Sequence, residues 1–323
     1  MLVANWWDKK KIKSESTRQG FGRGLLRAAK LDKRVVALTA DLAESTQVQA
    51  FARQFPARFF DVGVAEQNLA GVAAGLALAG KIPFMTSYAV FSPGRNWDQI
   101  RVSIAYNQAN VKIVSTHAGL NVGADGATHQ ALEDIALMRV LPNLTVVVPA
   151  DSRQAEQATL ALARKKGPSY LRLTRSATPV IFTDKSDFTI GKVQILQEGG
   201  DATIIACGPL VYQSLLAARQ LAAEGLRAAV INCHTIKPLD EAAIVRWAKQ
   251  TRAIVTVEEH QRAGGLGSAV AEMLARRLPT VQEFVAVDDS FGQSGTPEEL
   301  LRAYHLEVDD IVTAVKKVVA RKK

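Results

Sequence analysis

FFDVGVAEQNLAGVAAGLALAGKIPF, residues 59–84, contains an apolar run, one carboxylate, a long series of small apolar residues and the start of a second apolar run. The uncharged segment from Leu69 to Gly80 is twelve residues long, well below the roughly 20 that a transmembrane helix needs. We therefore expect a buried helix over 65–80, with Glu66 at its start. A helix between two buried strands is typical of a parallel α/β sheet.

The same alternation continues on both sides of this stretch. β-branched runs predict strands at 34–40, 82–88, 110–117, 144–150 and 169–175. Helical patterns lie near 18–30, 65–80, 97–107, 131–140 and 152–166. Apolar strands separated by helices indicate a mainly parallel sheet covered on both faces. The prediction is one α/β domain over 18–180, preceded by a basic tail at 1–17.

A second domain of the same class is predicted farther along the chain. Turn residues and a predicted hairpin interrupt the alternation, so we expect a linker at 181–200. Strands are then predicted at 202–207, 227–232, 253–259 and 281–287, separated by helices. The predicted fold class is therefore α/β, with two domains that are each a mainly parallel sheet flanked by helices, the second spanning 201–323.

Composition and charge exclude several classes of protein. The chain is 48% hydrophobic and 22% charged, and its net charge is +9. Nine of the 40 basic residues lie within 9–13 and 316–323, which leaves 31 basic against 31 acidic residues. With no zinc-finger, RNP-like or basic-zipper pattern, we expect no nucleic-acid partner. The short apolar segments predict no membrane partner.

The cysteines and the N-terminus indicate the compartment. Cys207 and Cys233 lie in apolar stretches without CxxC or metal-ligand spacing, so we expect buried free thiols. The first 13 residues contain no apolar core of signal-peptide length. These features predict a cytoplasmic protein.

Polar side chains follow the predicted strands of the first domain. Ligands of open α/β sheets bind beyond the carboxyl ends of the strands, so these residues are candidates for one site. They are Asp41, Ser45, Glu66, Tyr88, Phe91, His117, Asp125, His129 and Arg175.

Glu66 has two interpretations. A carboxylate in a first turn is stabilised by the positive end of the helix dipole, which would explain it without a function. The Gly and Ala residues around it, however, predict close packing. An enclosed carboxylate is costly unless it is hydrogen-bonded or serves chemistry. We favour a functional acid.

The stretch STHAGLNVGADGATHQALED, residues 115–134, places His117 and His129 on either side of a Gly-rich turn. A loop this long and flexible suits a metal site poorly, so we expect no metal bound by this chain. The glycines would instead let the loop wrap a polar ligand, while His117, Asp125 and His129 bind hydroxyls or move protons. A solvated loop is the alternative.

Motifs for other chemistries are missing. The chain has no GxSxG elbow, no Cys with a suitable His and no HExxH. GFGRG, residues 20–24, opens a helix before the first predicted strand instead of after one, so it is a weak phosphate-loop signal. Arg18 and Arg175 are candidates for binding anionic substrate groups, with surface solvation as the alternative.

Several of these motifs occur together in a known family. FFDVGVAEQNLAGVAAGLALAGKIPF, SYAVFSPGRNWDQIR, the loop at 115–134, NLTVVVPAD and YLRLTR, followed by HTIKPLD and FGQSGTPEELL, resemble the C-terminal half of transketolase. The resemblance runs from about Arg18 to the C-terminus and is strongest to the separate C-terminal subunit of split transketolases. It implies a pyrimidine-binding domain followed by a transketolase C-terminal domain.

The resemblance implies a role for each candidate. Thiamine diphosphate would be the cofactor, with Glu66 as the catalytic acid that hydrogen-bonds its aminopyrimidine. Phe91 would stack on that ring with Tyr88 beside it, although either could be the stacking residue, and Asp41 would also contact the cofactor. His117 and His129 would be catalytic as well as substrate-binding. The substrate, a sugar phosphate, would be held by Arg18, Ser45, His117, Asp125, His129 and Arg175.

The resemblance also implies a partner. The family binds the cofactor diphosphate through Mg2+ held by a GDG sequence and a distal Asn, and this chain has no GDG. An N-terminal transketolase subunit would bring that site, in an α2β2 heterotetramer. The reaction would transfer a two-carbon glycolaldehyde unit from a ketose phosphate to an aldose phosphate, and this chain would be inactive alone.

Three alternatives stay open. Ala124 stands where many transketolases carry Glu, and 1-deoxyxylulose-5-phosphate synthases have a similar loop. The beta subunits of 2-oxo acid dehydrogenases share the architecture but lack the DGATHQ pattern. A non-catalytic scaffold or regulatory subunit is the alternative from another class.

Overall fold

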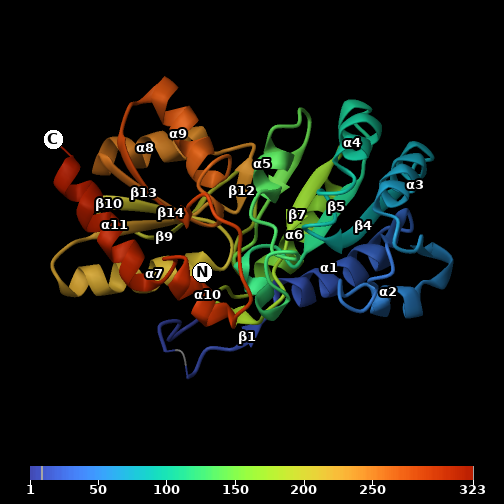
Figure 1. Ribbon diagram of the computed structural model, residues 1–323, viewed down its shortest axis with the longest axis horizontal. Coiled ribbons are helices and arrows are strands. Elements are labelled where there is room, and N and C mark those ends of the chain that lie inside the picture. The colour runs from blue at the N-terminus through green and yellow to red at the C-terminus, as the bar shows by residue number, and fades with distance from the viewer. Residues whose placement is uncertain (9, 323) are drawn as a thin grey trace.

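The computed structural model describes residues 1–8 and 10–322 and contains two α/β units side by side, the first drawn in blue to green and the second in yellow to red (Figure 1). Each has a mainly parallel sheet between helices. The predicted α/β fold class with two such domains is confirmed.

The first sheet has seven strands in the order β12-β6-β7-β5-β4-β2-β3. All neighbours are parallel except β12, which is antiparallel to β6. Every residue of the central strands β2 and β5 is buried, as expected for a sheet covered on both faces. The strands are β2 (Val35–Thr39), β3 (Phe59–Asp61), β4 (Ile82–Tyr88), β5 (Lys112–Thr116), β6 (Thr145–Val147), β7 (Ser169–Arg172) and β12 (Thr235–Lys237).

The helices of the first unit follow the predicted order. The longest is α1, whose Gly20 lies so close to α6 that a Cβ there would be 1.9 Å from the Ser152 carbonyl oxygen. The predicted helix at 97–107 is a short α-helix continued by a π-helix. The helices are α1 (Thr17–Leu31), α2 (Gln49–Gln54), α3 (Glu66–Leu78), α4 (Trp97–Gln99), the π-helix η2 (Ile100–Tyr106), α5 (Asp134–Arg139) and α6 (Ser152–Arg164), with 3-10 turns η1 (Pro56–Arg58) and η3 (Leu120–Asp125).

The second sheet has five strands in the order β14-β13-β10-β11-β9, with only β9 antiparallel. The C-terminal helix α11 lies along this sheet (Figure 1). The strands are β9 (Gln194–Gln197), β10 (Ala202–Ala206), β11 (Ala228–Asn232), β13 (Ala253–Gln261) and β14 (Val281–Val287). The helices are α7 (Leu210–Ala223), α8 (Glu241–Thr251), α9 (Leu266–Arg277), α10 (Pro297–Ala303) and α11 (Val308–Arg321).

Two connections cross between the units. Strand β12 lies beyond the predicted linker in sequence, yet it is the outermost strand of the first sheet, beside β6. One apolar core is continuous between the units, with Val146 and Val148 from the first and Ile205 and Ile231 from the second. The two sheets therefore share buried surface.

The segment expected as a basic N-terminal tail is packed against the domain junction. Strand β1 (Ser14–Glu15) pairs with β8 (Thr178–Pro179), and Leu2 forms a bridge with Phe182. Apolar residues at the start of the chain explain this difference, because Leu2 and Trp6 pack against the second unit's core. Cys207 and Cys233 are buried and free, as predicted. No helix in the described ranges is long and apolar enough to span a bilayer.

Candidate active site

The carboxyl ends of five parallel strands lie at one edge of the first sheet. In spatial order, β7, β5, β4, β2 and β3 are followed in the chain by Arg175, His117, Phe91, Asp41 and Glu66. Parallel pairing places all these strand ends on the same side. The candidate residues thus come from separate loops of one edge.

Glu66 begins helix α3 and its side chain is 5% exposed. Arg95 Nη1 donates a hydrogen bond to Glu66 Oε1 at 3.1 Å, and Asn96 Nδ2 donates to the Glu66 carbonyl at 3.0 Å. Within the described part of the chain, Glu66 Oε2 receives no hydrogen bond. The buried carboxylate therefore keeps one oxygen available to a ligand.

Four rings form an aromatic cluster next to this carboxylate. Tyr88 stacks on His117 with ring centroids 3.8 Å apart, and on Phe91 at 5.7 Å. His129 lies edge-on to Phe91 at 5.4 Å. Arg95 connects the cluster to Glu66, since its guanidinium carbon is 4.1 Å from the Phe91 centroid. These four predicted site residues are brought together.

His117 is held in an unusual backbone conformation inside the cluster. Its φ is +57°, and its Nδ1 shares a hydrogen bond with Thr116 Oγ1 at 2.8 Å. Burial, with smaller effects from Arg18, Arg175 and His129, lowers the pKa of His117 to about 3. The imidazole is therefore neutral at neutral pH and can exchange hydrogen bonds with a substrate hydroxyl. A strained, buried, neutral His suits a site more than a packing role.

Two arginines add positive charge to the same site. Burial, followed by the charge of Arg175, lowers the pKa of Arg18. Arg18 Nη1 donates to the Ser45 carbonyl at 2.6 Å, and its buried Nε has no partner among the described residues. Arg175 donates to the Val122 carbonyl at 2.6 Å and lies 3.5 Å from Asp125. Two neighbouring guanidiniums with one nearby carboxylate favour an anionic ligand.

Asp41 lies apart from these contacts. It is exposed, has a φ of +59°, and its backbone N–H donates to Asp61 Oδ1 at 2.9 Å. Asp61 also accepts from the Gly63 N–H at 3.0 Å and so ties the loop after β2 to the loop before α3. Asp41 shares the edge with Glu66, but no described contact joins it to the aromatic cluster.

Sequence reasoning missed three residues that organise the site. Arg95 and Asn96 both contact Glu66, and Asn121 bonds Ser176 beside Arg175. Arg95 and Asn96 follow the predicted aromatic residues within SYAVFSPGRNWDQIR, so their position after a strand was an available signal. Asn121 carried none, because its partners are distant in sequence.

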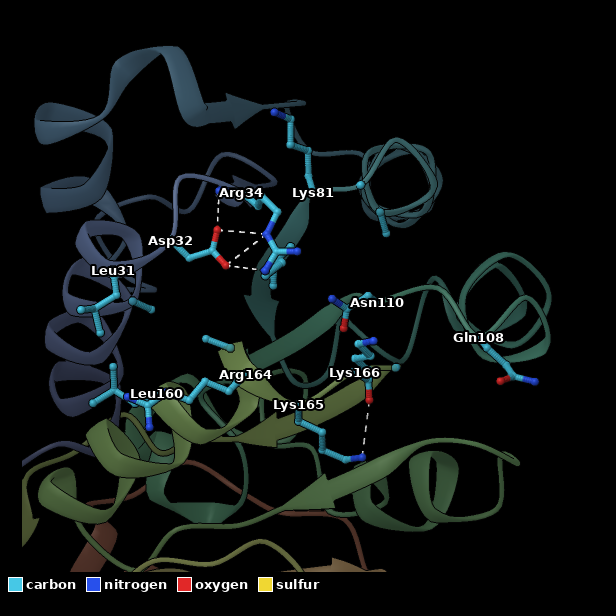
Figure 2. A pocket seen from close by; sticks show the side chains of 16 residues that line it. Leu31, Asp32, Arg34, Lys81, Gln108, Asn110, Leu160, Arg164, Lys165 and Lys166 are labelled. Carbon is cyan, nitrogen blue, oxygen red and sulfur yellow. Dashed lines mark hydrogen bonds and ion pairs between the residues drawn. The ribbon is translucent and has the colours of Figure 1, made fainter.

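A hollow of about 600 Å³ lies at the amino ends of the strands of the first sheet, opposite the candidate site. Arg34, Lys81, Arg164, Lys165 and Lys166 are among its lining residues (Figure 2). Figure 2 shows Asp32 paired with Arg34. Helices α1, α3 and α6 end here, and cations near helix C-termini offset the negative end of the dipole. These charges are explained by the fold without a ligand.

The site geometry suits the pyrimidine ring of thiamine diphosphate. An open oxygen of a buried carboxylate can pair with a ring nitrogen, and Phe91 already has a planar cation over its face. A metal is a different case. No group of three or more His, Cys, Asp or Glu residues that could hold a metal ion occurs in residues 1–8 and 10–322.

Comparisons with known proteins agree with this geometry. Residues 13–180 match the transketolase pyrimidine-binding domain, and residues 191–311 match the transketolase C-terminal domain. The fold and site thus define a chain of the transketolase class. The chain belongs to the transketolase family, which depends on thiamine diphosphate.

Within the family, the chain is a split-transketolase-like subunit. It is 44% identical to a 6-deoxy-6-sulfo-D-fructose transketolase subunit of Clostridium sp. (strain MSTE9), covering 92% of each chain. It is also 44% identical to a putative transketolase C-terminal section of Methanocaldococcus jannaschii, covering 92% of this chain and 94% of the relative. A solved split gene transketolase, described as an inactive beta4 tetramer, superposes with a TM-score of 0.90 at 47% identity, covering 95% of this chain and 99% of that one. The resemblance identified from the motifs is confirmed.

Proposed function

We propose that this chain is the C-terminal subunit of a split transketolase. It would transfer a two-carbon glycolaldehyde unit from a ketose phosphate to an aldose phosphate. The observation that carries the proposal is the buried Glu66 carboxylate, linked through Arg95 to Phe91 and lying at the same strand ends as two arginines and two histidines. When bound, thiamine diphosphate supplies the nucleophilic carbon and electron sink for this chemistry.

The residues of this chain would divide the work. Glu66 holds the aminopyrimidine by a hydrogen bond and exchanges a proton with it, and its burial makes that hydrogen bond strong. Phe91 and Tyr88 hold the ring plane, and Asp41 contacts the cofactor from the neighbouring loop. His117 and His129 bind substrate hydroxyls and move protons.

The anionic end of the substrate would bind at Arg18 and Arg175, with Ser45 and Asp125 beside them. Arg18 has a buried Nε without a partner in the described chain, which a phosphate oxygen can satisfy. The similar Clostridium subunit is named for a sulfonated sugar. A sulfonate and a phosphate present similar oxygens to two guanidiniums. We propose a sugar phosphate as the substrate, and the experiment below also tests the sulfonated sugar.

An N-terminal transketolase subunit would bring the Mg2+ and diphosphate site. Its docking surface would be the face formed by Gly71, Gly75 and Leu78 of α3 together with Val102 and Tyr106 of η2. Leu78 and Tyr106 are 70% and 82% exposed. A Cβ on either glycine would meet no atom within 4 Å, so a partner helix can approach closely. This face begins at Gly71, five residues after Glu66 in the same helix, which is consistent with a site shared between subunits in an α2β2 heterotetramer.

The test is reconstitution of the purified chain with an N-terminal transketolase subunit, thiamine diphosphate and Mg2+. Xylulose 5-phosphate with ribose 5-phosphate should give two-carbon transfer, and neither chain alone should. Product formation only from pyruvate and glyceraldehyde 3-phosphate would replace the proposal with a synthase. Transfer only from 6-deoxy-6-sulfofructose would change the substrate. Assembly without any turnover would support a non-catalytic scaffold.

A further inference from the structure

A glutamate of the second unit reaches the Gly-rich loop of the first. Glu259, near the end of β13, is 3% exposed, and its Oε1 accepts a hydrogen bond from the Asn121 N–H at 2.5 Å. Gly119 permits this approach, because a Cβ there would lie 2.5 Å from Glu259 Oε1. Its φ of +81° also favours glycine. The backbone at Gly119 therefore leaves the space that the Glu259 carboxylate occupies.

The other end of the loop is held from the same side. The Gln261 N–H donates to the Leu132 carbonyl at 2.7 Å. Arg172 Nη2 donates to the carbonyls of Glu259 at 2.9 Å and Ala131 at 3.3 Å. Gln130 Nε2 donates to the Gln293 carbonyl of the second unit at 3.0 Å. Residues 119–132 are therefore clamped at both ends by the C-terminal domain.

The clamped loop in turn holds the segment that carries Arg175. Asn121 Oδ1 accepts from the Ser176 N–H at 2.7 Å, and the Asn121 carbonyl accepts from Ser176 Oγ at 3.0 Å. The adjacent Val122 carbonyl accepts from Arg175 Nη1 at 2.6 Å. A continuous path of hydrogen bonds thus runs from Glu259 through the loop to the guanidinium proposed to bind substrate.

We propose that Glu259 of the C-terminal domain is a positioning residue that holds the 119–126 loop, and through it Arg175, in the orientation that binds the anionic group of the substrate. The role of Arg175 rests on the proposed function, whereas the hold on the loop does not. The C-terminal domain would thus contribute to substrate binding although Glu259 does not contact the substrate.

The charge on Glu259 is set by its surroundings. Burial raises its pKa to about 7, opposed by Arg172 of β7 and by the N–H groups of Asn121 and Leu120, while Asp134 of α5 also raises it. The ionised Glu259 carboxylate accepts a stronger hydrogen bond from the Asn121 N–H than the neutral carboxyl does. Removing the carboxylate leaves the Asn121 N–H buried without its acceptor, which favours local opening of the loop.

The test compares Glu259→Ala with Glu258→Ala. Glu258 is an equally buried neighbour, 1% exposed, but it accepts from the N–H groups of Leu266 and Gly267, both at 2.7 Å, at the start of α9. In the isolated chain, amide hydrogen exchange should show at least about tenfold lower protection over 120–126 in Glu259→Ala only. In the reconstituted pair, Glu259→Ala should raise KM for the phosphorylated substrate about tenfold and change kcat less than about twofold.

Glu259→Gln is the second variant, for use if the alanine variant does not fold. Glutamine keeps the size of the side chain and one acceptor oxygen. It should lower loop protection and raise KM in the same direction by a smaller factor. Unchanged protection in Glu259→Gln and in a folded Glu259→Ala would overturn the inference, as would an equal loss in Glu258→Ala. Lower protection with an active pair whose KM is unchanged would overturn the link to Arg175. If the Glu259 variants show lower protection but the wild-type pair turns over no sugar phosphate, the proposed function is refuted and the contact between Glu259 and the loop stays supported.

Discussion

Arg95 contacts both Glu66 and Phe91: Nη1 lies 3.1 Å from Glu66 Oε1, and the guanidinium carbon lies 4.1 Å from the centroid of the Phe91 ring. A planar cation thus forms one hydrogen bond and one stacking contact with the two residues proposed to hold the aminopyrimidine. Its side chain is 53% exposed, so it can turn away into solvent. Arg95 therefore covers the Phe91 face and one oxygen of Glu66, Oε1, with a side chain that can move away.

Replacing Arg95 with alanine should tighten cofactor binding. The wild-type guanidinium must leave the Phe91 face before another ring stacks there, and an exposed cation–π contact is worth about 0.5–1 kcal/mol. We expect the dissociation constant of thiamine diphosphate from the reconstituted pair to fall about two- to fivefold, measured by calorimetry. Arg153→Ala is the control, since Arg153 pairs with the exposed Asp184. Weaker binding in Arg95→Ala would instead make Arg95 a cofactor ligand.

Glu66→Gln should remove turnover while leaving assembly intact. The amide keeps the size of the side chain but cannot exchange a proton, and proton-transfer groups contribute about 10²–10⁴-fold to rate. We expect kcat of the pair to fall at least about 100-fold. Glu44→Gln, at an exposed acid near the same edge, should leave kcat unchanged. Size-exclusion chromatography checks assembly, and a Glu66→Gln pair of normal activity would refute the catalytic role.

His117 should make stability depend on pH on the acid side. Its folded pKa, lowered to about 3 by burial first and nearby cations second, lies below the unfolded value of about 6.5. The unfolded state therefore binds the proton first, and this contribution to stability is lost as pH falls from about 6.5 toward 3. In His117→Asn, the slope of unfolding free energy against pH should be lower by up to about 1.4 kcal/mol per pH unit between pH 5 and 6. Urea unfolding measures both slopes, and identical slopes would contradict the assignment.

Breaking the buried ion pair beneath the Gly-rich loop should cost far more than breaking a surface pair. Arg172 Nε lies 2.8 Å from Asp134 Oδ2, with side chains 3% and 1% exposed. Burial raises the pKa of Asp134, but the charges of Arg172 and His260 and the hydrogen bonds from Arg172 and Tyr170 together outweigh it, so the net shift is downward. Asp134→Asn leaves Arg172 buried without its counter-charge, so we expect a loss of about 3–5 kcal/mol in urea unfolding.

Asp32→Asn is the matched control for this prediction. Asp32 pairs with Arg34 at 2.7 Å, but the side chains are 32% and 65% exposed. Its loss should stay within about 1 kcal/mol, because water screens the pair. Equal losses in the two variants would show that the buried pair is not a major contribution to stability.

The elements predicted most accurately are those with a strong local pattern. The strand expected at 82–88 is β4, with the same bounds, and the helix expected at 65–80 is α3. The candidate site edge was also predictable, because parallel strands place the loops after Thr39, Tyr88 and Thr116 on one side. Strand β12 was missed, since three residues carry too little pattern to distinguish a strand from a turn.

The amino-acid sequence by itself determined the alternation of strands and helices, the two-unit architecture and the side of the sheet on which the polar loops lie. These properties follow from short-range periodicity and from the geometry of parallel strands. Only the tertiary structure decided that Arg95 occupies the face of Phe91, and that Glu259 binds the N–H of a residue 138 positions away. The first contact depends on how the loop after β4 folds, and the second depends on how the two units pack. The spacing of residues along the chain does not determine either contact.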